Sequence, residues 1–155
     1  SSEYVDSIAF KVELEMIKII RRFFQLKNHP YKILYSPHPF NNIDDLRNNK
    51  ALKQNDILFI ENTLESLLAA HAAVGIVSSA LFEAKTFSIP AFMPMNYSDG
   101  MFTKDELNLL SIAETHANRK ESFTHFLNSL KLPTSIDMES QINNRINILK
   151  PAINA

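Results

Sequence analysis

The chain contains only two glycines, Gly75 and Gly100. Phosphate-binding loops of the Walker and dinucleotide-binding types need several glycines, because their backbone must approach the phosphates closely. Neither type of loop can be built from this sequence. Any phosphate that binds here must therefore be held by side chains and by backbone amides at helix N-termini.

Cysteine is absent altogether, which rules out disulfides and thiolate metal sites and agrees with a reducing compartment. The net charge is only −1, so the total charge gives no sign of a nucleic-acid or other polyanion partner. No apolar run approaches the ~20 residues that span a bilayer, and no signal peptide opens the chain. The chain does not begin with methionine, so Ser1 and Ser2 indicate a cloning remnant or a domain boundary within a larger parent protein.

Apolar residues recur at helical spacing in some segments and form short continuous runs in others. Strands are predicted over residues 31–35, 57–60, 74–77 and 89–93. Helices are predicted over residues 3–26, 64–72, 80–86, 103–116, 119–130 and 137–149. Asn28-His29-Pro30 is expected to stop the first helix, and Thr63 is the expected N-cap of the second. A short helix within 41–55 and a turn over 96–102 complete the expected elements.

Apolar strands that alternate with helices indicate βαβ units. We therefore predict an α/β fold, a Rossmann-like parallel sheet with helices on both faces, as a single domain over residues 1–150 with a loose tail over 151–155. The chain opens on a helix, whereas a doubly wound unit opens on a strand. We expect that strand to lie in sequence upstream of this chain.

The first predicted strand runs into Ser36-Pro37-His38-Pro39. The two prolines fix the backbone on either side of His38 and deny it helical geometry. The imidazole is therefore held at a strand end, where it can donate to a phosphate oxygen or protonate a leaving phosphate. An ordinary turn histidine is the alternative, and a serine pair at a neighbouring strand end favours function.

That serine pair, Ser78 and Ser79, follows the third predicted strand about 40 residues after His38. At the start of a helix their amides and hydroxyls would converge on one anion site that needs no glycine. An ordinary helix N-cap is the alternative. Gly75, just inside the strand, favours the site because it permits close approach of a ligand.

Two carboxylates, Glu61 at a strand end and Glu65 in a first helical turn, are candidate acceptors for ribose hydroxyls. Complementing the helix dipole explains Glu65 equally well, and solvation at a strand end explains Glu61 better.

Other polar residues carry weaker signals. We interpret Asp44-Asp45 as a helix start and Asp99-Gly100 as a turn. The remaining histidines show no metal-ligand spacing, and His71 is interpreted as a packing residue; they are His29, His71, His116 and His125.

With these residues the chain resembles the C-terminal, nucleotide-binding half of GT-B-fold glycosyltransferases. More narrowly, it resembles the bacterial sialyltransferases and the glycosyltransferases of capsule and lipooligosaccharide synthesis. The resemblance covers about residues 5–95. His38-Pro39 matches the family's His-Pro motif, and Ser78-Ser79 matches its Ser-Ser motif. Residues 63–68 are similar to the segment whose glutamate binds the ribose of a cytidine nucleotide.

The resemblance implies a role for each matching residue. His38 would contact the nucleotide phosphate and act as the catalytic general acid, and Ser78 and Ser79 would hold the same phosphate. Glu65 would bind the ribose, and Pro39 would shape the turn. The implied donor is a sugar nucleotide, best represented by CMP-sialic acid, which passes its sugar to a bacterial surface glycan without a metal or other cofactor. A cytoplasmic location at the inner face of the membrane follows, with peripheral membrane contact through another part of the parent protein and no nucleic-acid partner.

The chain departs from the family in one respect. The family's third motif, an acidic pair followed by glycine, supplies the general base from the N-terminal domain, and nothing before His38 matches it. Asp99-Gly100 follows the serines and does not fill that role. We therefore expect the base and the acceptor site in an N-terminal domain of the parent. The alternatives are a glycerophosphate or other capsule-type transferase with a CDP donor, and a non-catalytic GT-B-like module that binds a nucleotide or a partner protein.

Overall fold

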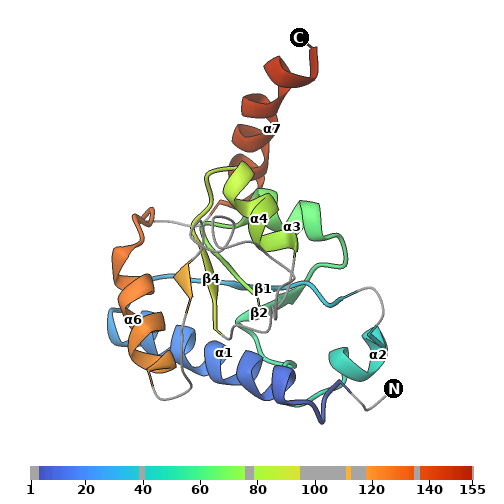
Figure 1. Cartoon of the computed structure of the whole chain (residues 1–155), viewed down its shortest axis with the longest axis vertical. Helices are drawn as coiled ribbons and strands as arrows, with labels where there is room; N and C mark the ends of the chain where they lie inside the picture. The colour runs from blue at the N-terminus through green and yellow to red at the C-terminus, as the bar shows by residue number, and fades with distance from the viewer. Residues whose placement is uncertain are drawn as a thin grey trace.

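A computed structural model describes residues 4–38, 41–75, 79–94, 111–112, 118–134 and 137–154 of the chain. Helices and short strands alternate along it (Figure 1). The helices are α1 (Ile8–Leu26), α2 (Ile43–Arg47), α3 (Thr63–Ala69), α4 (Ser79–Thr86), α6 (Arg119–Ser129) and α7 (Met138–Asn154). The strands are β1 (Ile33–Tyr35), β2 (Ile57–Phe59), β3 (Ala73–Val74), β4 (Ala91–Met93) and β5 (Ser111–Ile112).

The strands form two small parallel sheets. In the first, β1 pairs with β2 and places Leu34 opposite Leu58. In the second, the order is β3-β4-β5, with Val74 opposite Phe92. The predicted α/β alternation with parallel pairing is thus confirmed. One continuous Rossmann-like sheet is absent from the described residues, because a cavity separates β1 from β3 and no ladder hydrogen bonds join them.

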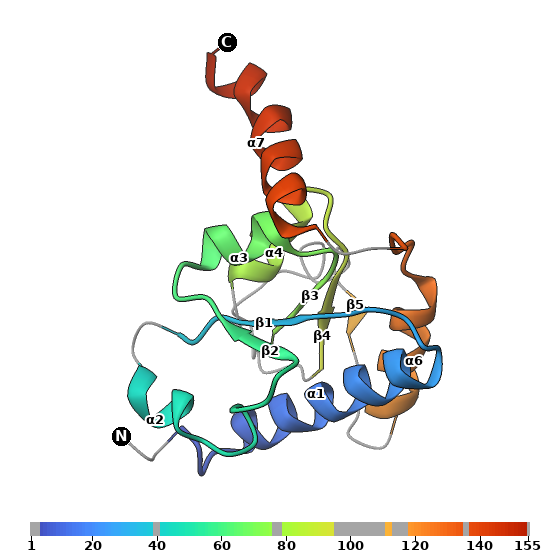
Figure 2. The same ribbon diagram turned by 180° about the vertical axis from the view of Figure 1, so that it is seen from behind.

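Helices cover both faces of the strands (Figures 1 and 2). Helices α1, α2 and α6 lie on one face, and α3 and α4 lie on the other, with α7 projecting beyond them. Helix α1 packs beneath both sheets: Phe10 and Ile17 lie in a cluster with Ile33 of β1, and Val12 lies in another with Phe92 of β4. The apolar core of the opposite face gathers Leu67 of α3, Leu81 and Ala84 of α4, and Ile89, Ala91 and Met93.

The ends of α1 are set by capping groups. The sequence predicts a helix from residue 3, but the helix begins at Ile8, because the Ser7 hydroxyl accepts from the Phe10 amide at 3.1 Å and caps it. At the other end Asn28 adopts a φ of 49°, and the His29 amide donates to the Phe24 carbonyl at 3.0 Å. This left-handed termination confirms the predicted stop at Asn28-His29-Pro30.

Helix α3 differs from its prediction at both ends. Thr63 is expected as the N-cap, but the Asn62 side chain accepts from the Glu65 amide at 3.0 Å and takes that role. Asparagine is as good a cap as threonine, and it comes one residue earlier. The helix ends at Ala69 rather than at residue 72, because Ala70 turns to extended backbone and the chain enters β3.

Two predictions near the C-terminus are also corrected. Ser111–Ile112 form strand β5, paired with Phe92 and Met93, so a continuous helix over 103–116 is wrong. Strand pairing of residues 111–112 with β4 therefore overrides the helical spacing of apolar residues in this segment. The rest of that range and the turn predicted over 96–102 lie outside the described residues. Helix α7 continues past Pro151 to Asn154, where a tail was expected, even though a proline removes a hydrogen bond and crowds the carbonyl four residues earlier.

A buried arginine joins three elements. Arg119 is 3% exposed at the start of α6. Its Nε donates to the Pro94 carbonyl after β4 at 3.0 Å, and its Nη1 donates to Glu15 Oε2 on α1 at 2.7 Å. These bonds satisfy the guanidinium and fix α6 against α1.

A second ion pair joins α1 to the loop before β2. Arg21 donates to Asp56 through Nε at 2.6 Å and through Nη2 at 2.9 Å, and the Tyr31 hydroxyl donates to Asp56 Oδ2 at 2.6 Å. The hydrogen bond from Arg21 is the largest influence that lowers the pKa of Asp56, to about 2.

The lowered pKa of Asp56 predicts acid sensitivity. Its contribution to stability is complete above the unfolded-state pKa near 4 and is lost as the pH falls toward 2. We expect Asp56→Asn to lower the free energy of unfolding at pH 7 by about 2 kcal/mol and to flatten its pH dependence below pH 4. Urea unfolding between pH 2 and 7 measures both effects.

The matched control is Glu61→Gln, which breaks an exposed ion pair between Arg47 and Glu61 whose side chains are 47% and 61% exposed. It should change stability by less than ~1 kcal/mol. An Asp56→Asn protein that keeps the acid dependence of the native chain would contradict the prediction.

The backbone at Ser88 supports a second prediction. Ser88 follows α4 with a φ of 59°, a conformation that favours glycine. We expect Ser88→Gly to raise the free energy of unfolding by about 1 kcal/mol. The control Ser122→Gly, inside α6, should lower it by about 0.5 kcal/mol. Thermal unfolding of both variants measures these changes in stability. A destabilised Ser88→Gly protein would refute the strain argument.

Candidate functional site

The carboxyl ends of β1 and β3 open onto a cavity of about 700 Å³ between the two sheets. Because the strands of each sheet are parallel, polar residues that follow them gather at one edge. The cavity is lined there by Ser36 after β1, Thr63 at the start of α3 and Gly75 after β3. The Ser36 and Thr63 hydroxyl oxygens lie 3.3 Å apart, so they form a polar rim that joins the ends of β1 and α3.

His38 lies at this rim, as its sequence context predicts. Its carbonyl accepts from the Asn41 amide at 2.9 Å, so these two residues lie close together after β1. Both residues line the cavity. The backbone bond places His38 just after β1, and its exposed side chain at the cavity mouth is accessible to an anionic ligand. Pro39, expected to shape the turn after β1, lies outside the described residues.

The serine pair is described only in part. Ser78 lies outside the described residues, and for Ser79 the structure places the backbone alone, as the first residue of α4. This confirms the helix predicted to follow β3. Because Gly75 lines the cavity and α4 begins four positions later, the N-terminus of α4 follows closely on the rim. Backbone amides at such a helix start can bind an anion.

The two candidate carboxylates lie outside the cavity lining. Glu65 is exposed in the first turn of α3, while its neighbours Thr63 and Ser66 do line the cavity. Glu61 is exposed and accepts from Arg47 Nη2 at 2.7 Å. The structure therefore brings His38 to the rim but leaves both carboxylates on the outer surface.

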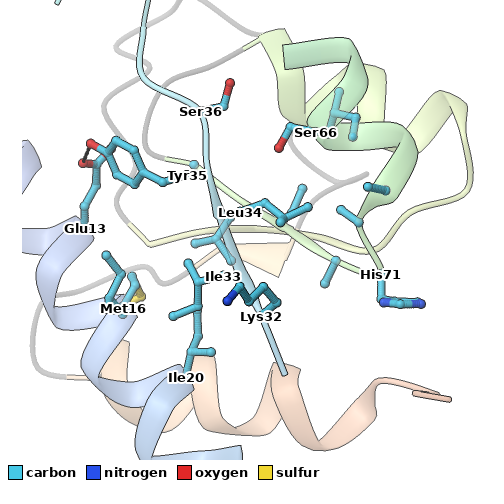
Figure 3. A pocket seen from close by; sticks show the side chains of 18 of the residues that line it. Glu13, Met16, Ile20, Lys32, Ile33, Leu34, Tyr35, Ser36, Ser66 and His71 are labelled. Carbon is cyan, nitrogen blue, oxygen red and sulfur yellow. Dashed lines mark hydrogen bonds between the residues drawn. The ribbon is translucent and has the colours of Figure 1, made fainter. Parts of the chain in front are cut away.

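Glu13 is a site residue that sequence reasoning missed. It lies on the sheet-facing side of α1, and its Oε2 accepts from the Tyr35 hydroxyl at 2.8 Å (Figure 3). Burial raises the pKa of Glu13, and hydrogen bonds from Tyr4 and Tyr35 offset part of the rise. Burial also raises the pKa of Tyr35. A carboxylate inside an apolar helical stripe, four residues before Ile17, is the sequence signal that could have revealed it.

The far end of the cavity has a different character. Figure 3 shows Lys32 and His71 there, away from Ser36. Burial lowers the pKa of His71, helped by the charge of Arg145. Arg145 of α7 donates to the carbonyls of Leu67 and Ala70 at 3.2 and 2.8 Å, so it caps the C-terminus of α3. The interpretation of His71 as a packing residue agrees with this partly buried position.

The other polar candidates behave as helix and surface groups. Asp44 and Asp45 lie in the first turn of α2, capped by the Asn42 side chain at 3.0 and 3.3 Å, which confirms the predicted helix start. His125 is exposed on α6, and His29 lines the cavity beside the end of α1. His116 and Asp99-Gly100 lie outside the described residues.

The described part of the chain contains neither a cluster of metal ligands nor a helix able to span a membrane. Its histidines and carboxylates form no group of three or more that could bind a metal ion. None of its helices combines the length and the hydropathy that crossing a membrane requires.

No protein-family model, curated protein or solved structure matches this chain.

The raised pKa of Glu13 predicts a pH-dependent variant. The penalty for burying the charged form is absent below the unfolded-state pKa near 4.5 and grows as the pH rises through the folded-state pKa. Glu13→Gln keeps an acceptor for Tyr35 and removes that charge. We expect its stability relative to the native chain to increase between pH 4 and pH 8, measured by urea unfolding.

The matched control is Glu15→Gln, two residues along the same helix. It leaves buried Arg119 without its charged partner, so it should destabilise the chain at pH 7 by about 2 kcal/mol. A Glu13→Gln protein whose relative stability does not change with pH would show that burial does not disfavour the Glu13 charge.

Proposed function

We propose that this chain is the nucleotide-sugar-binding domain of a bacterial glycosyltransferase, built as the Rossmann-like half of a GT-B fold. The observation that carries the proposal is the polar rim at the carboxyl edge of the parallel strands. His38, Ser36 and Thr63 line one cavity there, and α4 begins shortly after β3. Open α/β sheets bind their ligands at this edge.

The anion would be bound without a glycine-rich loop. The rim offers the His38 imidazole and the start of α4, to which Ser78 and Ser79 would add hydroxyl donors. Pro39 would hold the turn. Together these donors would stabilise the negative charge that develops on a leaving nucleotide phosphate, which is the role of a metal ion in other transferases.

In the proposed reaction, the acceptor hydroxyl oxygen bonds to the anomeric carbon as the bond from that carbon to the phosphate oxygen breaks. His38 donates a proton or a hydrogen bond to the departing phosphate. The acceptor proton passes to a base in an N-terminal domain of the parent protein. The chain by itself would then bind the donor without turning it over.

The proposed donor is a cytidine nucleotide sugar, best represented by CMP-sialic acid, and the acceptor is a glycan of the bacterial surface. Glu65, exposed two residues after Thr63 of the rim, would bind the ribose of a nucleotide that extends outward from the rim. Transfer would take place in the cytoplasm at the inner face of the membrane.

Nucleotide titration tests the proposal. We expect CMP to shift backbone NMR signals around His38 and Gly75. His38→Ala should weaken the affinity about tenfold or more, since a hydrogen bond to a charged group contributes about 1.5–3 kcal/mol. His125→Ala, on the exposed face of α6, is the matched control and should bind as the native chain does.

CDP and UDP titrated in parallel define the donor class. Tighter binding of CDP than of CMP would favour a CDP-linked donor, and tighter binding of UDP would exclude a cytidine donor. If none of the three binds at millimolar concentration, the proposed function is wrong.

A further inference from the structure

The cavity between the sheets has the surroundings of a central β-strand. Strand β1 borders it on one side and β3 on the other, while Met16 and Ile20 of α1 and Leu67 of α3 line its two faces. Figure 3 shows Met16 and Ile20 on α1, beside β1. Protein interiors rarely contain voids larger than a water molecule. A largely apolar cavity of about 700 Å³, bordered by two strands and two helices and open at its polar rim, can therefore accept an occupant.

The edge of β1 that borders the cavity has hydrogen-bonding groups directed into it. The Ile33 amide donates to the backbone carbonyl of Asp56, just before β2, at 2.8 Å. The Tyr35 carbonyl accepts from the Ile60 amide at 2.9 Å. In a parallel strand successive residues direct their N–H and C=O groups to opposite sides. The groups of Leu34 therefore face away from β2, toward the cavity.

Strand β3 presents the same arrangement from the other side. The amides of Ala73 and Gly75 donate to the carbonyls of Pro90 and Phe92 at 2.9 and 3.2 Å. Val74, between them, directs its N–H and C=O away from β4, and it lines the cavity. The edges of β1 and β3 thus border the space from opposite sides, and no ladder pairs them.

The handedness of the fold shows which part of the chain belongs there. Helix α2 connects β1 to β2 and packs with α1 in one cluster, where Leu46 joins Phe10 and Ile17. Crossovers between parallel strands are almost always right-handed, so two crossovers on the same face step across the sheet in the same direction. The step from β1 to β2 leads away from the cavity. A strand that leads into α1 would therefore lie on the other side of β1, in the cavity.

We propose that this cavity seats one further parallel β-strand, supplied by the polypeptide immediately upstream of α1. Tyr4, in the turn that leads into α1, lines the cavity, so the chain can enter it there. A strand residue between two helical layers occupies about 160 Å³, the product of its rise, the strand spacing and the layer spacing. The cavity therefore fits about four or five residues, and its lining selects apolar side chains.

The seated strand would unite the two sheets. The strand order becomes β2-β1-new-β3-β4-β5, which is the order of the dinucleotide-binding doubly wound sheet. The new strand would end between Ser36 and Gly75, at the point where the direction of winding reverses. This inference rests on packing and topology and is independent of the proposed function.

Amide exchange tests the proposal on the chain extended by the residues that its gene encodes before residue 1. About fifteen residues suffice for a strand and its connections. We expect the Leu34 and Val74 amides to exchange at least about 100-fold more slowly than that of Phe59, which faces away from β1 on the outer edge of β2. Nuclear Overhauser contacts should join the upstream run to Leu34 and Val74. Replacing its apolar residues with serine should abolish both signals.

Four results would overturn the proposal. The gene could encode no apolar run of at least about four residues in that stretch. The Leu34 and Val74 amides could exchange as fast as that of Phe59 in the extended chain. Direct contacts between Leu34 and Val74 would show that β1 and β3 pair and close the cavity. Protection that rises with protein concentration, together with a dimer in sedimentation, would make a second copy the occupant. All these readouts come from the extended chain without nucleotide.

Discussion

The packing of helix α1 against both sheets is the contact on which the rest of the structure depends. No ladder hydrogen bonds join the two sheets in the described part of the chain, so side-chain packing sets their relative position. Phe10 and Ile17 contact the β1–β2 side, and Val12 and Met16 contact the side of β4. Each of these buried side chains contributes about 1.5–3 kcal/mol, so α1 stabilises an arrangement that backbone pairing does not provide.

The candidate site is a consequence of that arrangement. With both sheets held over α1, the turn at His38 and the hydroxyls of Ser36 and Thr63 line the same cavity. The same helix brings Glu13 within 2.8 Å of the Tyr35 hydroxyl, so its packing face also contributes a titratable group. An anion site at this edge would draw on residues from β1 and α3 together, and the sheet-facing side of α1 keeps those elements in place.

A strand seated in the cavity would explain both why the sheet is divided and why the candidate site lies beside the division. Leu34 and Val74 direct backbone groups into the space that separates the sheets, and a strand seated there would satisfy them both. The same strand would convert two small sheets into one and place a switch of winding direction beside the polar rim. Ligand-binding crevices of open α/β sheets form at such switch points. Buried Arg119, which pairs with Glu15, would then brace the neighbouring end of β4 against α1.

The sequence by itself determined the features that depend on neighbouring residues. These are the alternation of helices with short apolar strands, the helix stop at Asn28 and the position of His38 just after a strand. Periodicity, capping and proline geometry act over a few residues, so they can be recognised in the sequence. Only the tertiary structure decided that Glu13 is buried, that Ser111–Ile112 pair with β4 and that the sheet is divided by a cavity. Each of these depends on contacts between segments far apart in the chain. Local pattern gives a hint only for Glu13, whose carboxylate interrupts the apolar stripe of α1.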